Sequence, residues 1–167
     1  LDQADLYAAV RQDVPYDEPA NLPVFEQDIP EFFAAGTDRS KVRGKFGVTH
    51  FAGVGGEITD ESDAERRVLH AGLFGMNSNV QRAQVTDGLS HTLAAGEIAD
   101  DLPPWGDPEN WRSVGRGLNR DRQGFGNHAR TGACFLMADG SVRFLSNRTA
   151  PAILSALSTR DGGESHP

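Results

Sequence analysis

The sequence has little cysteine and no long apolar run. Cys134 is its single cysteine, so the chain cannot form an internal disulfide, and cysteine use does not indicate a redox compartment. No run of about 18 apolar residues is present, which excludes a spanning helix within this sequence. No signal peptide is visible either. Because the sequence begins at Leu1 rather than Met, we expect a processed or trimmed piece, for which missing targeting signals carry little weight.

Positive charge is also scarce. Lys and Arg number 16 against 24 Asp and Glu, giving a formal net charge of -8. Sequence-independent binding of nucleic acid needs phosphate-neutralising Lys and Arg, so this composition argues against it, and against docking on anionic lipid. We interpret the acidic excess as a solvated surface. Weak binding of divalent cations is the alternative.

Catalytic motifs are missing as well. The chain has no HExxH, P-loop, CxxC or GxSxG pattern, and its five histidines lack metal-ligand spacing. A set such as Ser90, His128 and Asp139 can be chosen from almost any sequence. We therefore predict that the protein is not an enzyme. The alternative is a hydrolase with an unrecognised site, which would need His128 within hydrogen-bonding reach of Asp87, Glu97 or Asp139 at the base of a pocket.

Glycine and proline are abundant, at 19 and 9 residues, which favours short elements joined by ordered loops. Apolar spacing predicts helices over residues 2–12 and 150–160, with a helical turn near 24–28. Runs rich in β-prone residues predict strands at 48–54, 82–85 and 92–98. The stretch 100–126 is long and irregular. This is an α+β pattern, which we expect to form one domain over residues 1–167 with a loose tail at 161–167.

The clearest local pattern is GACFLMADGSVRFLS, residues 132–146. Asp139-Gly140 between two apolar runs predicts a β-hairpin with a two-residue type I′ turn, because this pair tolerates positive φ angles. That turn fixes the register. The core side would carry the pairs Met137–Val142 and Phe135–Phe144, and the partly covered side the pairs Leu136–Arg143 and Cys134–Leu145.

Two groups of residues are candidates for binding. Asp87 and Asp139 precede glycines in turns, where an aspartate side chain ordinarily bonds nearby backbone N–H groups. Ligation of calcium together with loop carbonyls is the alternative. Trp105 and Trp111 lie in the stretch 100–126. They either pin this loop to the body of the protein or, if exposed, stack on the sugar rings of a glycan.

Segments spread over nearly the whole chain match a known family in the same order. They are Leu6-Tyr7 with Ala20-Asn21, residues 49–56, residues 85–92 running on to Gly96-Glu97, His128, residues 135–145, and residues 156–164. On these segments the chain resembles the planctomycete pilin-like proteins that carry domain of unknown function 1559, also labelled solute-binding family 10. Such proteins typically have a prepilin-type cleavage and methylation signal and a C-terminal His-x9-Asp-Gly signature.

The chain departs from the family pattern in three places. Ten residues separate His128 from Asp139, one more than in the signature, which questions a fixed geometry for His128. The family's frequent Cys-Pro-Ser-Asp is replaced by residues 34–38, Ala-Ala-Gly-Thr-Asp, so a cysteine-dependent feature is lacking there. The methylated apolar helix of the family is not in this sequence, and we expect the chain to correspond to the later part of such proteins.

The resemblance implies an extracellular, periplasmic or cell-surface protein with an α+β head of the pilin or pseudopilin kind. Its partners would be other pilin-like subunits or secretion machinery. Related pseudopilins can bind calcium in head loops, which makes Asp87, Glu97 and Asp139 the candidate metal ligands. The alternative is a secreted module that binds a glycan or small solute, with Trp105, Trp111 and His128 as its candidate contacts.

Overall fold

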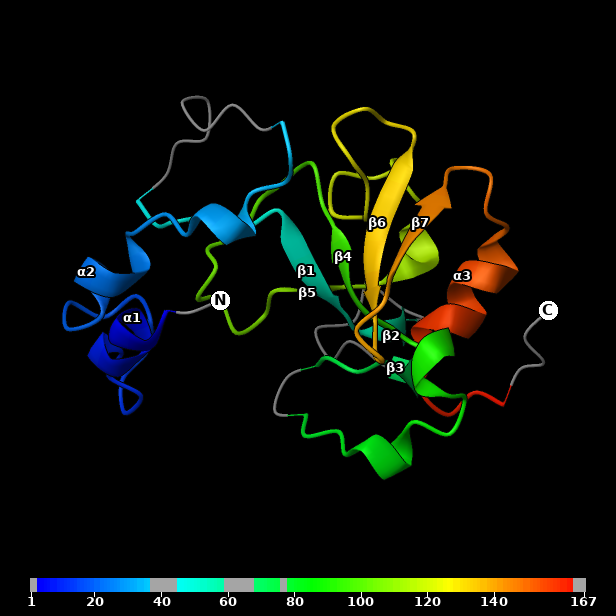
Figure 1. Cartoon of the computed structure of the whole chain (residues 1–167), viewed down its shortest axis with the longest axis horizontal. Helices are drawn as coiled ribbons and strands as arrows, with labels where there is room; N and C mark the ends of the chain where they lie inside the picture. Colours follow the sequence, from blue (N-terminus) through cyan, green and yellow to red (C-terminus); the bar gives the residue numbers. More distant parts are fainter. Residues whose placement is uncertain (1–2, 37–44, 59–67, 76–77, 164–167) are drawn as a thin grey trace. The chain divides into compact units, whose positions relative to one another are not determined.

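The computed structural model describes residues 3–36, 45–58, 68–75 and 78–163 (Figure 1). Its contacts group into two compact units, and each is considered by itself. The first comprises Leu1–Phe51 with Leu102–Asn110, and the second comprises Ala52–Asp101 with Trp111–Pro167. The single domain expected over residues 1–167 stays a prediction. Most of the expected loose tail, residues 164–167, lies outside the described residues.

In the described residues of the first unit there are three short helical segments. They are α1 (Ala4–Ala9), α2 (Leu22–Phe25) and the 3-10 segment η1 (Pro30–Phe32). The helix predicted over 2–12 is present but shorter, and the predicted turn near 24–28 begins earlier, at Leu22. An aromatic cluster supplies much of the packing. The ring centroid of Phe25 is 4.4 Å from that of Trp105 and 5.9 Å from that of Tyr16.

A buried asparagine organises the chain between α1 and α2. The Asn21 side chain, 1% exposed, donates to the carbonyls of Arg11, Val14 and Pro15 at 2.9 to 3.1 Å. Its amide oxygen accepts from the Arg11 N–H at 2.8 Å. Carbonyls that have no helical partner are thereby satisfied, as a buried backbone requires. This explains how a segment with no regular structure keeps one path.

The second unit is built on a five-stranded sheet in the order β5–β1–β4–β6–β7. The strands are β1 (Phe51–Val54), β4 (Leu93–Glu97), β5 (Trp111–Arg112), β6 (Gly132–Met137) and β7 (Val142–Ser146). β1 and β5 are parallel, whereas β4–β6 and β6–β7 are antiparallel. A separate ribbon pairs β2 (Gly56–Ile58) with β3 (Val68–Ala71). The α+β prediction is thus confirmed.

Within the part of this unit that the structure describes, one helix and three 3-10 segments accompany the strands. α3 (Pro151–Ser158) contacts η5 (Val114–Arg116), β2 and β4, and it confirms the helix predicted over 150–160. The other 3-10 segments are η3 (Arg82–Gln84) and η4 (Leu89–His91). Ala133, Phe135 and Met137 of β6 are at most 1% exposed and form the centre of the core with Leu93 and Phe125. Burial of each large apolar side chain contributes about 1.5–3 kcal/mol.

The strand predicted at 82–85 is wrong. Residues 82–84 form η3, which begins after Gln81. The Gln84 side chain accepts a hydrogen bond from the Gln81 N–H at 2.7 Å, and the Gln81 side chain in turn accepts from the Gln84 N–H. This reciprocal cap satisfies backbone groups that a strand would have had to pair elsewhere.

The hairpin of β6 and β7 is confirmed, but its predicted register is wrong by one residue. The Met137 N–H donates to the Ser141 carbonyl, so the loop has three residues, 138–140, and Gly140 has a φ of 89°. This is a turn closed by a left-handed glycine bulge. Asp139 supports it by accepting from the N–H and hydroxyl of Ser141 at 2.8 and 2.6 Å.

The shift changes which side chains share a face. The observed pairs are Cys134–Phe144, Phe135–Arg143 and Leu136–Val142. Phe135 and Met137 face the core as predicted, but Val142 and Phe144 do not. They lie with Cys134 and Leu136 on the opposite, exposed face, since a one-residue slip turns a strand's side chains over.

Replacing Gly140 tests the bulge. We expect Gly140→Ala to lower the free energy of unfolding by about 1–2 kcal/mol, because an L-residue is strained at positive φ. A Cβ at Gly140 meets nothing within 4 Å, so the loss is conformational and not steric. Gly75→Ala is the matched control, with no close contact and no positive φ. Urea unfolding measures both, and an equal effect of the two changes would contradict the bulge.

Candidate functional site

The predicted metal ligands are each engaged in a separate local contact. The Asp87 carboxylate accepts from the N–H groups of Gly162 and Gly163 at 2.8 and 3.0 Å, and the Asp87 N–H donates to the Arg160 carbonyl. It therefore fastens the chain after α3 to the turn before η4. Asp87 therefore bonds backbone N–H groups, as the sequence suggested. The N–H groups belong to a segment distant in sequence, however, and not to the turn that contains Asp87.

Glu97 and Asp139 lie elsewhere on the sheet. Glu97, at the end of β4, accepts from the Cys134 N–H at 3.3 Å. The Ser141 hydroxyl holds the pKa of the Asp139 carboxyl below its ordinary value. Among the described residues, no three His, Cys, Asp or Glu side chains form a group that could hold a metal ion. Calcium binding by these residues therefore stays a prediction.

The two tryptophans belong to different units. Trp105 packs against Phe25, and its indole N–H donates to the Gln27 carbonyl at 2.9 Å, which is the pinning role considered for this loop. Trp111 forms β5 with Arg112, and its ring lies against the backbone of Gly55. Both are half-buried. His128 is exposed, whereas the hydrolase alternative requires it at the base of a pocket.

Sequence reasoning missed Arg112, which connects the two ends of the long stretch 100–126. The Arg112 guanidinium donates four hydrogen bonds to backbone carbonyls (Nη1 to Arg122 and Gly124 at 3.0 and 2.8 Å, Nη2 to Asp100 and Asp101 at 3.1 and 2.7 Å). Burial lowers the pKa of this guanidinium, although arginine stays protonated. A basic residue in an acidic, glycine-rich loop was the only signal available in the sequence.

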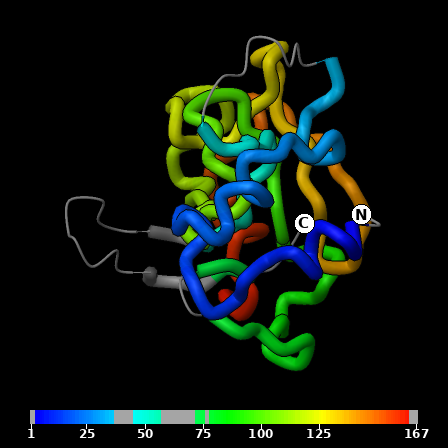
Figure 2. The backbone as a smooth tube through the Cα atoms, turned by 90° about the vertical axis from the view of Figure 1, so that its left-hand side faces the viewer, coloured from blue at the N-terminus to red at the C-terminus, as the bar shows by residue number. Residues whose placement is uncertain are grey.

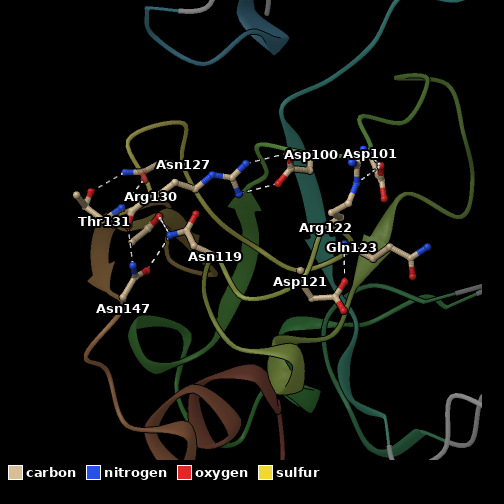
Figure 3. Close-up of polar contacts among 12 residues, drawn as sticks. Asp100, Asp101, Asn119, Asp121, Arg122, Gln123, Asn127, Arg130, Thr131 and Asn147 are labelled. Atoms are coloured by element: carbon tan, nitrogen blue, oxygen red, sulfur yellow. Dashed lines mark hydrogen bonds and ion pairs between the residues drawn. The ribbon is translucent and has the colours of Figure 1, made fainter.

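Exposed ion pairs surround this centre (Figure 3). Arg130 forms two contacts with Asp100, at 2.6 and 2.9 Å, and Arg122 two with Asp101, at 2.8 and 3.1 Å. The hydrogen bond from Arg130 is the main reason why the pKa of Asp100 lies below its ordinary value. Asn119 donates to the Asn147 side chain at 2.7 Å and to the Gly132 carbonyl at 3.0 Å.

Three residues of this network adopt left-handed backbone conformations that are unusual outside glycine. They are Asp101, Asn119 and Arg130, with φ of 46°, 57° and 56°. Such conformations cost about 1–3 kcal/mol each and persist only where surrounding contacts hold them. Each of the three side chains makes the polar contacts described above. The network therefore maintains a strained loop, and its carboxylates, its guanidinium groups and the Asn119 amide nitrogen bond to one another or to backbone carbonyls.

The second feature of the site is an exposed apolar surface on the hairpin. We call Cys134, Leu136, Val142 and Phe144 the hairpin face. Leu136, Val142 and Phe144 are 43%, 67% and 52% exposed, and the register places all four side chains on one side of β6 and β7. β7 is the last strand of the sheet, and Figure 2 shows it in orange at the margin of the second unit.

The comparison with protein families identifies residues 1–119 as SBP_bac_10, described as a protein of unknown function (DUF1559). The chain belongs to this family. No curated protein and no protein of solved structure shows significant similarity to it. The resemblance that we noted in the sequence is thus confirmed for the matched range.

The matched range leaves out part of the sequence resemblance. It ends at residue 119, before His128, Asp139 and the hairpin. The correspondence of His128–Gly140 to the C-terminal signature of DUF1559 proteins therefore stays a prediction. In the described part of this DUF1559 chain, no helix is long and apolar enough to cross a bilayer.

Arg112→Lys tests the centre of the loop network. A lysine ammonium cannot span four carbonyls as the planar guanidinium does, so we expect a loss of roughly 2–3 kcal/mol in the free energy of unfolding. Arg122→Lys is the control, because the Arg122 side chain forms an exposed ion pair with Asp101, and such pairs contribute little to stability. Urea unfolding compares them. Equal losses would show that Arg112 has no organising role.

The thiol of Cys134 offers a test of the local environment of the hairpin face. Partial burial, and secondarily the charge of Glu97, raise the pKa of Cys134 above its ordinary value. Because only the thiolate reacts, alkylation at neutral pH should be slow and should accelerate as the pH rises. Glu97→Gln removes the charge, so we expect faster alkylation at a given neutral pH. A rate that this change leaves the same or lowers would contradict the assigned contact.

Proposed function

We propose that this DUF1559 protein is a non-enzymatic structural subunit, of the type IV pilin or pseudopilin kind, at the cell surface or in a secretion apparatus. The single observation that carries the proposal is the hairpin face. The resemblance of the sequence to pilin-like proteins supports an extracellular, periplasmic or surface location. The occupant proposed for the face is a second copy of this chain, so its function is assembly.

The edge position of the hairpin favours pairing with another strand. Cys134 donates its N–H toward β4, and alternation along the strand turns the N–H and C=O groups of Phe135 toward β7. Its partner Arg143 turns toward β6, so the backbone groups of Val142 and Phe144 point away from the sheet. An edge strand with open backbone groups is a template for another strand.

The side chains of the hairpin face add a hydrophobic contribution to that pairing. Contiguous exposed apolar residues mark interaction surfaces more often than isolated ones do. Antiparallel pairing of two β7 strands would bring the Val142 and Phe144 side chains of both copies together on one side of a continuous sheet. Burial of such side chains contributes about 25 cal/mol per Å² of apolar area removed from water. Backbone pairing supplies direction, and the apolar contact supplies stabilisation.

Phe144→Lys combined with Val142→Lys tests the assembly role. We expect the unchanged protein to self-associate as its concentration rises, and the double variant to do so at least about tenfold more weakly, since 1.4 kcal/mol changes an equilibrium constant tenfold. Sedimentation velocity measures the association, and circular dichroism verifies that the variant folds. Because both side chains are largely exposed, folding should be unaffected.

The matched control is Tyr7→Lys, which changes an equally exposed aromatic residue, 69% exposed, in the first unit. It should leave association unchanged. The alkylation rate of Cys134, the single cysteine, provides a second measurement that needs no mutation, because alkylation should slow as the chain assembles. A protein that stays monomeric at every concentration, or an equal effect of the Tyr7 change, would refute self-assembly through this face.

A further inference from the structure

The second unit contains an open cavity of about 600 Å³ that none of the foregoing uses. One wall comes from η5 and the loop after it, residues 114–120, and the other from residues 147–156, which include the first turns of α3. Figure 1 shows the first of these walls, η5, in yellow-green next to α3, which it contacts. A volume of this size is within the range of small-molecule sites and suits a ligand as large as a mono- or disaccharide.

The lining is cationic although the chain as a whole is acidic. Its two charged residues are Arg116 and Arg120, and no Asp or Glu is among the lining residues. Arg116 is paired on one side with Asp121 at 3.1 Å. In a chain with a formal net charge of -8, a cavity lined by two arginines and no carboxylate is a local reversal of charge, which favours anions.

Arg120 is the residue available to a ligand. In the part of the chain that the structure describes, no hydrogen bond or ion pair engages its side chain. Arg112, Arg116, Arg122 and Arg130 are all bonded to carbonyls or carboxylates. The methylene chain of Arg120 lies over Gly117, whose φ is 73° and where a Cβ would be 3.0 Å from the Arg120 Cδ. The guanidinium is thus supported by the loop while its donors remain open.

The remaining lining residues indicate which chemical groups the uncharged part of a ligand would carry. Val114, Leu118, Pro151 and Leu154 provide apolar area, and Thr149 and Ser155 line the cavity with hydroxyl-bearing side chains. A sugar ring presents both kinds of surface, with apolar C–H groups and hydroxyls. Arginine recognises carboxylate and phosphate groups with paired hydrogen bonds. We propose that this cavity binds a sugar-sized organic anion whose charged group is held by Arg120.

The proposal is independent of assembly, since the cavity shares no residue with the hairpin face. Calorimetric titration of the full chain with galacturonate, glucose 6-phosphate and glucose tests it. We expect one or both anions to bind and glucose to bind at least tenfold more weakly. Binding of galacturonate alone would assign a carboxylate, binding of the phosphate alone would assign a phosphate, and binding of both would assign a general anionic group.

Arg120→Gln is the decisive variant, and we expect it to weaken anion binding at least tenfold. Arg148→Gln is the matched control, because it removes the same charge from an exposed arginine one residue from the lining residues Asn147 and Thr149 without belonging to the lining. It should change the Kd less than twofold. No anion binding by the unchanged protein, equal binding of glucose, or equal effects of the two variants would overturn the proposal.

Discussion

The second unit depends on the guanidinium of Arg112, whose hydrogen bonds to backbone carbonyls take the place of pairing with a neighbouring strand. Residues 98–101 and 111–131 of this unit have only the two residues of β5 in the sheet, so most of their carbonyls lack a ladder partner. Arg112 collects four of them. Because Arg112 also belongs to β5, the same residue ties these carbonyls to the edge of the sheet next to β1. A loop of this length would otherwise leave buried polar groups unpaired, which a folded chain avoids.

This constraint explains the distribution of strain around the loop. Asp101 contributes its carbonyl to Arg112 and its carboxylate to Arg122, and its backbone is left-handed. Asn119 and Arg130 likewise combine a left-handed backbone with polar side-chain contacts. The exposed pairs add little stability by themselves. Together with the four hydrogen bonds of Arg112 they select one path for the loop, and residues 114–120 of that path form one wall of the arginine-lined cavity.

The sequence allowed prediction of elements whose signals are local. α3 follows from Pro151 and an apolar stripe, and β4 and β6 follow from β-prone runs next to turn residues. The strand prediction for residues 82–85 was wrong because capping by Gln81 and Gln84 stabilises a 3-10 turn over a weak strand pattern. The predicted register of β7 was wrong because Asp-Gly is compatible with both a two-residue turn and a three-residue loop with a glycine bulge. The four-carbonyl role of Arg112 involves partners 10 to 12 residues away, which no local pattern encodes.

That one-residue difference in register changes which side chains are exposed. In the predicted register Val142 and Phe144 would fill the core, and the outer face would carry Arg143 and Leu145. In the observed one, Arg143 pairs with Phe135 while Val142 and Phe144 join Leu136 outside. The core does not need them, because Phe135, Met137 and Phe125 are already fully buried. Apolar side chains that stay exposed after folding favour association, because burying them at an interface removes apolar area from water. The glycine bulge thus determines that the edge strand of this sheet has apolar side chains on its exposed face.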